Sequence, residues 1–284
     1  MKIAISRQDL IHLIGKIQAI VPTKPPFPAL GHVLLESKEN MLTLSATDLT
    51  TSMKLFCPAQ VMEEGSIALP ARKFFQLIRE LTSADILICS SQESASITSG
   101  TSLFKMSGLD KTKFPDLPDF SLGTQFSIEN SLLKEMLVRS SFAAARDDNR
   151  QVLKGILFQN LKKIATFIGT DGKRLAKLQA VISSLEDVEG SYILPLKAVE
   201  EIIKLLENEQ EQAKVCLMQD KISIELNSVI LISKLLFGKY PDIDKVIPQK
   251  SSDPLVIHRE ELLSLLRQVS LFTPDTTTAV RFSL

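Results

Sequence analysis

The sequence contains few of the residues that metal sites and disulfide frameworks require, and it has no tryptophan at all. Its cysteines are odd in number, widely spaced and set in strand-like runs, namely Cys57, Cys89 and Cys216. This pattern argues against a disulfide framework, so we expect buried free thiols. The histidines are equally scattered, at His12, His32 and His258. Because a ligand cluster would have to bring these distant residues together, we expect no metal site and no cofactor.

The chain also lacks a long apolar run and a net charge. No run approaches the roughly 18 apolar residues of a membrane span. The 33 basic residues balance 33 acidic ones, and 44% of residues are hydrophobic, which is ordinary for a soluble globular protein. The opening "MKIAISRQDL" places Arg7 and Asp9 where a signal peptide has its apolar core. The sequence therefore predicts a cytoplasmic protein.

Four pairs of segments recur in the same order at offsets of 123 to 126 residues. They are residues 30–36 with 153–159, 42–55 with the run around Thr170, 68–81 with 193–206, and 114–117 with 240–243. Each match is weak alone, but their common order and nearly constant offset indicate two homologous domains of about 125 residues.

A third copy begins near the end of the sequence. Residues 262–272 resemble the openings at 10–20 and 132–142, and residues 279–284 resemble the first strand of each repeat. A helix and one strand cannot bury a core, so the intact molecule is expected to hold three copies, roughly 375 residues. We expect a first domain at residues 1–119, a second at 120–248, and the start of an incomplete third at 249–284.

Each copy is predicted to be α+β, with two helices packed on antiparallel sheet. The first helix has its apolar stripe at Leu10, Leu13, Ile14 and Ile17, and Ser6 with Asp9 is a plausible capping box. The second helix starts behind a proline in both copies, at Pro70 and Pro195. Alternating apolar residues at, for example, 84–91, 94–99, 214–219 and 221–226 predict the strands.

The segment "FIGTDGKRL" at residues 167–175 combines a turn signal with two cations. Asp171 and Gly172 between apolar runs predict a type I′ hairpin, with Gly172 supplying the positive φ. The first copy shares the threonine and aspartate, as Thr47 and Asp48, so we assign these to the turn itself. It does not share the next residues, since 49–51 read Leu-Thr-Thr instead of Gly-Lys-Arg. The Gly-Lys-Arg-Leu half is therefore a candidate site.

Together the repeats and the segments "PTKPPFPALGHVLLE", "LPARKFFQLIREL", "FPDLPDF", "GTDGKRLA" and "KYPDIDKVIP" resemble the bacterial DNA polymerase III beta subunit family, the sliding clamps. The resemblance runs from Met1 to Leu284. It implies a homodimeric ring of three-domain protomers that encircles duplex DNA and acts in DNA replication as a processivity factor, not as an enzyme. With most of the third domain missing, we expect that this chain cannot form the normal ring.

The resemblance implies contacts to double-stranded DNA, independent of base sequence, from a proline-stiffened loop and nearby basic residues. The residues that match are Lys24, Arg72, Lys73, Arg146 and Arg150. Contacts to phosphate carry no sequence information, so many weak ones permit sliding. Relatives carry a polar glutamine and two tyrosines where this chain has Asp147, Gln151 and Val152.

The resemblance also implies a cleft that receives short linear peptides of the replicative polymerase, the clamp loader and repair proteins. Its second-domain wall, carried over by motif, is Leu153, Thr170, Gly172, Lys173, Arg174, Leu175, Pro241, Lys245, Val246 and Ile247. Apolar members would take leucine and aromatic anchors, and Arg174 offers a donor fork. Lys173 replaces the usual histidine, and Thr277 stands where some members have an aromatic residue. Because the other wall belongs to the third domain, we expect reduced peptide affinity here.

Ring closure in the family points to Lys73, Phe104, Leu271 and Phe272 as the dimer interface, where exposed apolar side chains would form a hydrophobic patch. Two other functions were considered. An enzyme using Asp48 and Asp171 as paired carboxylates is disfavoured because these residues occupy equivalent places in separate domains. A tandem-repeat protein that binds only other proteins would share the fold but would not encircle DNA.

Overall fold

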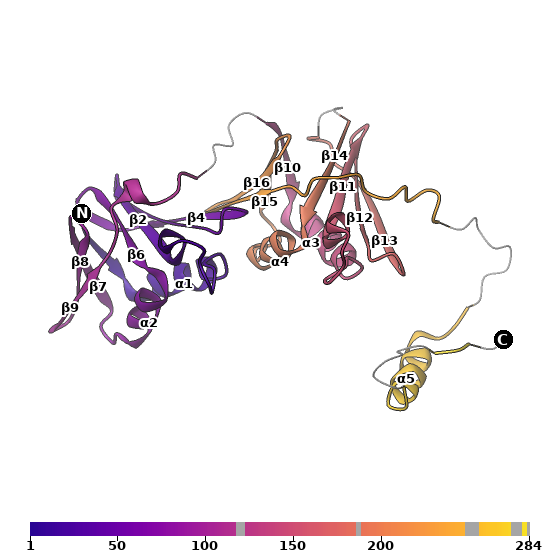
Figure 1. Cartoon of the computed structure of the whole chain (residues 1–284), viewed down its shortest axis with the longest axis horizontal. Helices are drawn as coiled ribbons and strands as arrows, with labels where there is room; N and C mark the ends of the chain where they lie inside the picture. Colours follow the sequence, from indigo (N-terminus) through magenta and orange to yellow (C-terminus); the bar gives the residue numbers. More distant parts are fainter. Residues whose placement is uncertain (118–122, 186–188, 248–255, 274–279, 283–284) are drawn as a thin grey trace. The chain divides into compact units, whose positions relative to one another are not determined.

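The structure is a computed structural model that describes residues 1–117, 123–185, 189–247, 256–273 and 280–282. These residues fall into two compact units, Met1–Tyr240 and Pro241–Leu284. The first unit contains the first predicted copy and the second as far as Tyr240, and its elements are shown in Figure 1. The domain borders expected near residues 119 and 248 lie outside the described residues.

The two copies share one order of elements, except that the first has an additional short strand, β5, between β4 and β6. The first comprises β1 (Lys2–Ser6), α1 (Arg7–Ile17), β2 (His32–Lys38), β3 (Met41–Thr47), β4 (Thr51–Pro58), β5 (Gln60–Glu63), β6 (Gly65–Pro70), α2 (Ala71–Glu80), β7 (Asp85–Ser91), β8 (Ser94–Ser99) and β9 (Ser102–Ser107). The second comprises β10 (Thr124–Glu129), α3 (Asn130–Ser141), β11 (Gly155–Leu161), β12 (Ile164–Thr170), β13 (Leu175–Val181), β14 (Gly190–Pro195), α4 (Leu196–Leu205), β15 (Gln212–Leu217), β16 (Lys221–Leu226) and β17 (Val229–Lys234). The predicted α+β class is confirmed.

One sheet joins the two copies. Its strand order is β10-β15-β16-β17-β4-β3-β2-β6, and the junction is the antiparallel pair β17 and β4, with Val229 opposite Leu55 and Ser233 opposite Thr51. The other sheets belong to single copies, in the orders β5-β1-β7-β8-β9 and β13-β12-β11-β14. Strands far apart in the sequence therefore lie side by side at the junction, as Figure 1 shows for β4 and the strands of the second copy.

The apolar stripes predicted for the helices face the core. Leu10, Ile14 and Ile17 of α1 are fully buried, and so are Phe74 and Ile78 of α2. Burial of this kind is worth about 1.5–3 kcal/mol for each large side chain, which is more than helix propensity can supply. The helices are thus held by the sheet rather than by their own sequence.

The second helix of each copy begins where the prolines predict it. Pro70 and Pro195 occupy the N-cap positions of α2 and α4. The capping box predicted for α1 is wrong, because the Ser6 side chain makes no capping hydrogen bond. The first amide of the helix, that of Arg7, donates instead to the carbonyl of Ala84 at 2.7 Å. The amide of Asn130 at the start of α3 donates to Glu211 in the same way.

The second unit contains α5 (Arg259–Ser270), which matches the helix predicted for the third copy. The strand predicted at residues 279–284 is not formed at residues 280–282, and its other residues lie outside the described ranges. A strand needs a partner for its hydrogen bonds, and no partner is present among the described residues of this unit. None of the described helices is both long and apolar enough to cross a membrane.

The thiols lie in different environments. Cys57 and Cys216 are buried, as predicted, and burial raises the pKa of both thiols. The prediction for Cys89 is wrong, since it is only partly buried. Strand β7 alternates its side chains between two faces, and Ile86 and Ile88 occupy the core face while Cys89 occupies the other. In the described ranges, His, Cys, Asp and Glu side chains form no cluster of three or more that could hold a metal ion.

Candidate functional site

The β12–β13 connection is a four-residue loop, Asp171 to Arg174, with Thr170 opposite Leu175 at its base. The predicted hairpin is therefore confirmed, but its two-residue type I′ turn is wrong. The Thr170 hydroxyl accepts a hydrogen bond from the Gly172 amide at 3.0 Å and donates to the Arg174 carbonyl at 2.7 Å. Gly172 has the expected positive φ, at 85°.

Asp171 caps this loop. Its Oδ1 accepts hydrogen bonds from the amides of Lys173, at 2.9 Å, and Arg174, at 3.0 Å. These two amides, with a smaller contribution from the Arg174 side chain, hold the pKa of Asp171 below its usual range. The carboxylate is thus a fixed anion at the base of the candidate peptide site.

The first copy builds the same loop with different side chains. The Thr47 hydroxyl accepts from the Leu49 amide at 3.0 Å, and Asp48 Oδ1 accepts from the amides of Thr50 and Thr51 at 2.9 and 2.7 Å. Leu49 has φ 72°, close to that of its counterpart glycine. The assignment of threonine and aspartate to the turn itself is confirmed.

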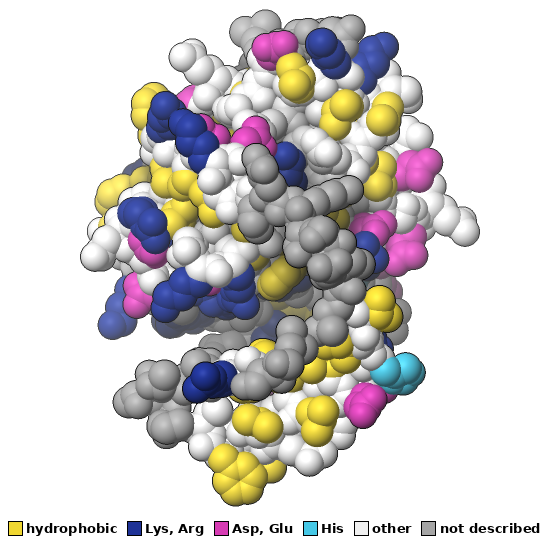
Figure 2. All heavy atoms as spheres, turned by 90° about the vertical axis from the view of Figure 1, so that its right-hand side faces the viewer, with side chains coloured by type: hydrophobic (Ala, Val, Ile, Leu, Met, Phe, Trp, Pro, Cys, Tyr) yellow, Lys and Arg dark blue, Asp and Glu magenta, His cyan; other side chains and the backbone are white. Residues whose placement is uncertain are grey.

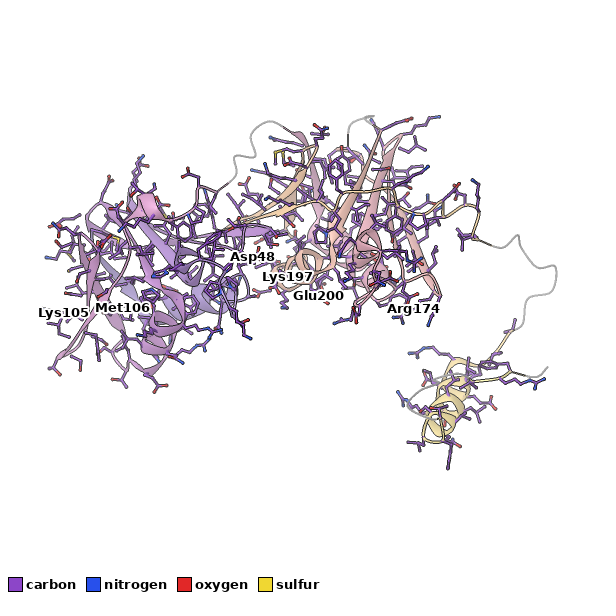
Figure 3. All side chains as sticks on the ribbon, viewed as in Figure 1. Asp48, Lys105, Met106, Arg174, Lys197 and Glu200 are labelled. Atoms are coloured by element: carbon purple, nitrogen blue, oxygen red, sulfur yellow. The ribbon has the colours of Figure 1, made fainter. Side chains whose placement is uncertain are left out.

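The two loops differ in the partner of the second carboxylate oxygen. Asp48 Oδ2 accepts from Lys197 Nζ at 2.5 Å, and Figure 3 shows these side chains meeting at the junction of the copies. The Thr50 carbonyl accepts from the Lys234 amide at 2.8 Å, which fastens the same loop to β17. Asp171 Oδ2 instead accepts from Nε of its own neighbour Arg174 at 3.1 Å. The aspartate of the first loop is therefore paired with a lysine of the second copy, whereas the aspartate of the second loop is paired with an arginine of the same loop.

Arg174 is held from two sides and remains accessible. Its guanidinium carbon lies 5.8 Å from the centroid of the Phe142 ring, at the C-cap of α3. The arginine side chain is 59% exposed, and so is Phe142 as a residue. Sequence reasoning missed Phe142. The available signal was an aromatic residue at the end of a helix whose equivalent in the first copy is Ala19.

Arg150 also lies at this loop, although it was predicted as a DNA contact. A Cβ built on Gly172 would lie 3.1 Å from Arg150 Nη2, so the guanidinium packs against the glycine. Arg150 donates from Nε and Nη2 to both carboxylate oxygens of Asp148, at 3.1 and 2.9 Å. Mainly through these bonds, and through the Arg150 amide, the pKa of Asp148 falls to about 2.

The remaining wall residues divide between the two units. Leu153 and Thr170 are buried, while Leu175 is half-buried. The hydroxyl of buried Tyr240 donates to the Ile168 carbonyl at 3.3 Å, which fixes the end of the first unit against β12. The wall residues of the second unit are exposed, namely Pro241, Lys245, Val246 and Ile247. Thr277 lies outside the described residues.

The candidate DNA contacts on the first copy are exposed and partly organised. Arg72, at the start of α2, donates from Nη2 to the Thr23 carbonyl at 2.8 Å, which ties it to the loop that carries Lys24. Lys24 and Lys73 are exposed, with no ion pair to any described residue. Arg146 is 83% exposed and pairs with Glu200 at 3.1 Å. The first copy therefore offers the less neutralised cations.

Several cations of the predicted helices are paired with carboxylates. Lys16 of α1 contacts Glu207 at 3.3 Å, and Lys134 of α3 contacts Glu209 at 3.8 Å. The first of these pairs lies at an open groove of about 340 Å³ between α1 and α4. Because each pair offsets one positive charge, the attraction of the helices for phosphate is weaker than their sequence alone indicates.

Comparison with known proteins decides the family. Residues 1–118 match the N-terminal domain and residues 127–242 the central domain of the DNA polymerase III beta subunit. This chain belongs to the DNA polymerase III beta subunit family. The beta sliding clamp of Chlamydia pneumoniae is 47% identical over 284 residues, which cover 100% of this chain and 77% of that protein.

Solved sliding clamps have the same fold. The clamp of Bacillus subtilis superimposes with a TM-score of 0.93 at 25% identity, covering 98% of this chain and 75% of the other. A clamp from Bartonella birtlesii bound to griselimycin gives 0.91 at 29% identity, covering 97% and 76%. The two repeats detected in the sequence correspond to the N-terminal and central clamp domains.

The candidate interface residues of this sliding clamp are accessible. Phe104 lies on β9, the last strand of its sheet, and is 37% exposed. In the second unit Leu271 is 81% and Phe272 87% exposed, beside a helix with no buried residue. Figure 2 shows exposed hydrophobic side chains of this kind in yellow on the visible face. Large exposed apolar side chains in pairs are typical of protein contact surfaces.

Proposed function

We propose that this protein is the processivity factor of a bacterial replicative polymerase, a ring-shaped clamp that encircles duplex DNA. The observation that carries the proposal is the match of both repeats to successive clamp domains over nearly all of residues 1–242. The β17 and β4 pairing supports it, because a sheet that continues from one domain to the next suits a closed ring. The role requires no catalysis, so we propose a cytoplasmic, non-enzymatic accessory subunit.

We further propose that Lys24, Arg72 and Lys73 contact DNA phosphates, with Arg146 and Arg150 as weaker contributors. The hydrogen bond between Arg72 and Thr23 supports a joint role for the α2 start and the loop of Lys24. Salt bridges to Glu200 and Asp148 reduce the contribution expected from the two arginines of the second copy. Phosphate contacts of this kind are independent of base sequence.

The loop from Asp171 to Arg174, with Leu153 and Leu175, is proposed as one wall of a cleft for short linear peptides of polymerases and other replication proteins. The exposed residues after Tyr240, namely Pro241, Lys245, Val246 and Ile247, are proposed as further peptide contacts. The support for the wall is a loop whose amides are held by Asp171 and whose arginine side chain is exposed. Sliding clamps of Bartonella birtlesii and Pseudomonas aeruginosa have been solved bound to griselimycin, so relatives bind a ligand of this kind. Lys73 and Phe104, with Leu271 and Phe272, are proposed as the homodimer interface.

Topological retention on DNA tests the main proposal. A version of the protein with a complete third clamp domain is loaded with a clamp loader onto nicked circular plasmid and separated from unbound protein by gel filtration, and the plasmid is then cut once. A clamp is expected to remain on the circle and to be lost from the linear form. Retention on linear DNA would contradict encirclement, and absence of retention on either form would favour a scaffold that binds only proteins.

A further inference from the structure

The C-terminal end of α3 carries a contact that the first copy lacks. The burial pattern aligns Leu10, Leu13 and Ile14 of α1 with Leu133, Met136 and Leu137 of α3, 123 residues later. At the same offset, Phe142 corresponds to Ala19 of the first copy. Arg174 corresponds to Thr51, because the amide of each residue donates to the aspartate of its own loop. Since the first copy folds with Ala19 and Thr51 at these positions, the fold does not require the aromatic and guanidinium pair.

Two contacts fix the guanidinium of Arg174 and leave its Nη atoms available as hydrogen-bond donors. Nε donates to Asp171 Oδ2 at 3.1 Å, and the guanidinium lies within the range of a cation–π contact from the Phe142 ring. Among the described residues neither Nη atom of Arg174 has a hydrogen-bond acceptor. Arginine side chains have high conformational entropy, so two restraints on one guanidinium reduce the cost of ordering it when a ligand binds.

We propose that Phe142 is a positioning residue of the peptide cleft: its ring holds the Arg174 guanidinium so that the free Nη fork meets a carbonyl or carboxylate of the bound peptide. This inference rests on the proposed peptide-binding function. The occupant is the short linear peptide of the proposed cleft, with leucine or phenylalanine anchors beside that acceptor.

The test measures the affinity of a fluorescein-labelled short peptide with leucine and phenylalanine anchors, by anisotropy, and of griselimycin, by calorimetry. Phe142→Ala and Phe142→Leu should each weaken binding about two- to fivefold, the effect of one cation–π contact at an exposed site. Phe142→Tyr keeps the π face and should bind like the wild type. Val138→Ala is the matched control, because Val138 lies one turn earlier on α3, is 46% exposed and has no aromatic ring for the guanidinium.

A double-mutant cycle separates positioning from structural support. In an Arg174→Ala background, Phe142→Ala should have no further effect on affinity, because the ring acts through the arginine. Wild-type affinity in Phe142→Leu, or an equal loss from Phe142→Ala with and without Arg174, would overturn the proposal. If neither this chain nor a version with a complete third clamp domain bound either probe, the peptide cleft itself would be wrong. All variants should unfold within about 2 °C of the wild type, since Phe142 is 59% exposed.

Discussion

Gly169 of β12 lies against the backbone of the last turn of α3, and replacing it with alanine should loosen that contact. A Cβ at this position would lie 2.1 Å from the Ser140 carbonyl oxygen, far inside van der Waals contact. The obstacle is the helix backbone, so relief requires a shift of α3 rather than a change of rotamer. Overpacking in a core typically costs about 1–3 kcal/mol, and this contact belongs at the upper end of that range.

We therefore expect Gly169→Ala to lower the unfolding temperature by about 6–10 °C, since 1 kcal/mol corresponds to about 2–4 °C in a chain of this size. Gly15→Ala in α1 is the matched control, because nothing lies within 4 Å of a Cβ there. Alanine in an exposed helix position should raise stability by up to about 1 kcal/mol. Calorimetry and urea unfolding at 25 °C measure both variants. Wild-type stability of Gly169→Ala would refute the argument that α3 is fixed by this contact.

Three further predictions concern the loops and the DNA surface. Lys197→Met should lower the free energy of unfolding by no more than about 1 kcal/mol, because the lysine is 54% exposed. Asp48→Ala should lower it by about 2–3 kcal/mol, because two backbone amides also lose their acceptor. Urea unfolding compares the two variants. Asp148 should titrate near pH 2 in a carboxyl NMR experiment, and Arg150→Ala should return its pKa toward about 3.9. Since the folded pKa is depressed, the stabilisation is present above pH 4 and is lost as the pH falls toward 2. An unchanged titration midpoint of Asp148 in the variant would contradict the assigned cause. Lys24→Ala should weaken DNA binding at all sequences alike and reduce the slope of log K against log salt by about 1 if it contacts a phosphate, and an unchanged slope would exclude that contact.

The repeats were predictable because each copy must satisfy the same local rules. The apolar periods of α1 and α2, the prolines before α2 and α4, and the threonine and aspartate of the loops each correspond to one local requirement of the fold. Such requirements leave a sequence signal in every copy, and comparison of the copies identifies them. The capping box of α1 failed because the Ser6 side chain makes no capping hydrogen bond, and the first helical amide, that of Arg7, is satisfied by the carbonyl of Ala84, which is distant in sequence.

The charge of the helices was harder to predict, because ion pairing depends on residues far apart in the chain. Lys16 and Glu207 are 191 residues apart, and Lys197 is 149 residues from Asp48. No local sequence pattern predicts either of these two ion pairs. The sequence correctly placed basic residues on the helices but could not show which of them are offset by a carboxylate, and the DNA surface proposed here consequently depends more on Lys24, Arg72 and Lys73.

Gly172 shows how the two kinds of information combine. Its positive φ does not by itself demand glycine, since Leu49 adopts the same conformation in the first copy at a cost of about 1–2 kcal/mol. What distinguishes the second copy is the Arg150 guanidinium, 3.1 Å from the position that a Cβ would occupy. Glycine therefore both relieves strain and admits an arginine against the loop. The second copy thus combines a glycine at residue 172 with Arg150, Arg174 and Phe142. Together these residues convert a shared structural turn into the surface that we propose for a ligand.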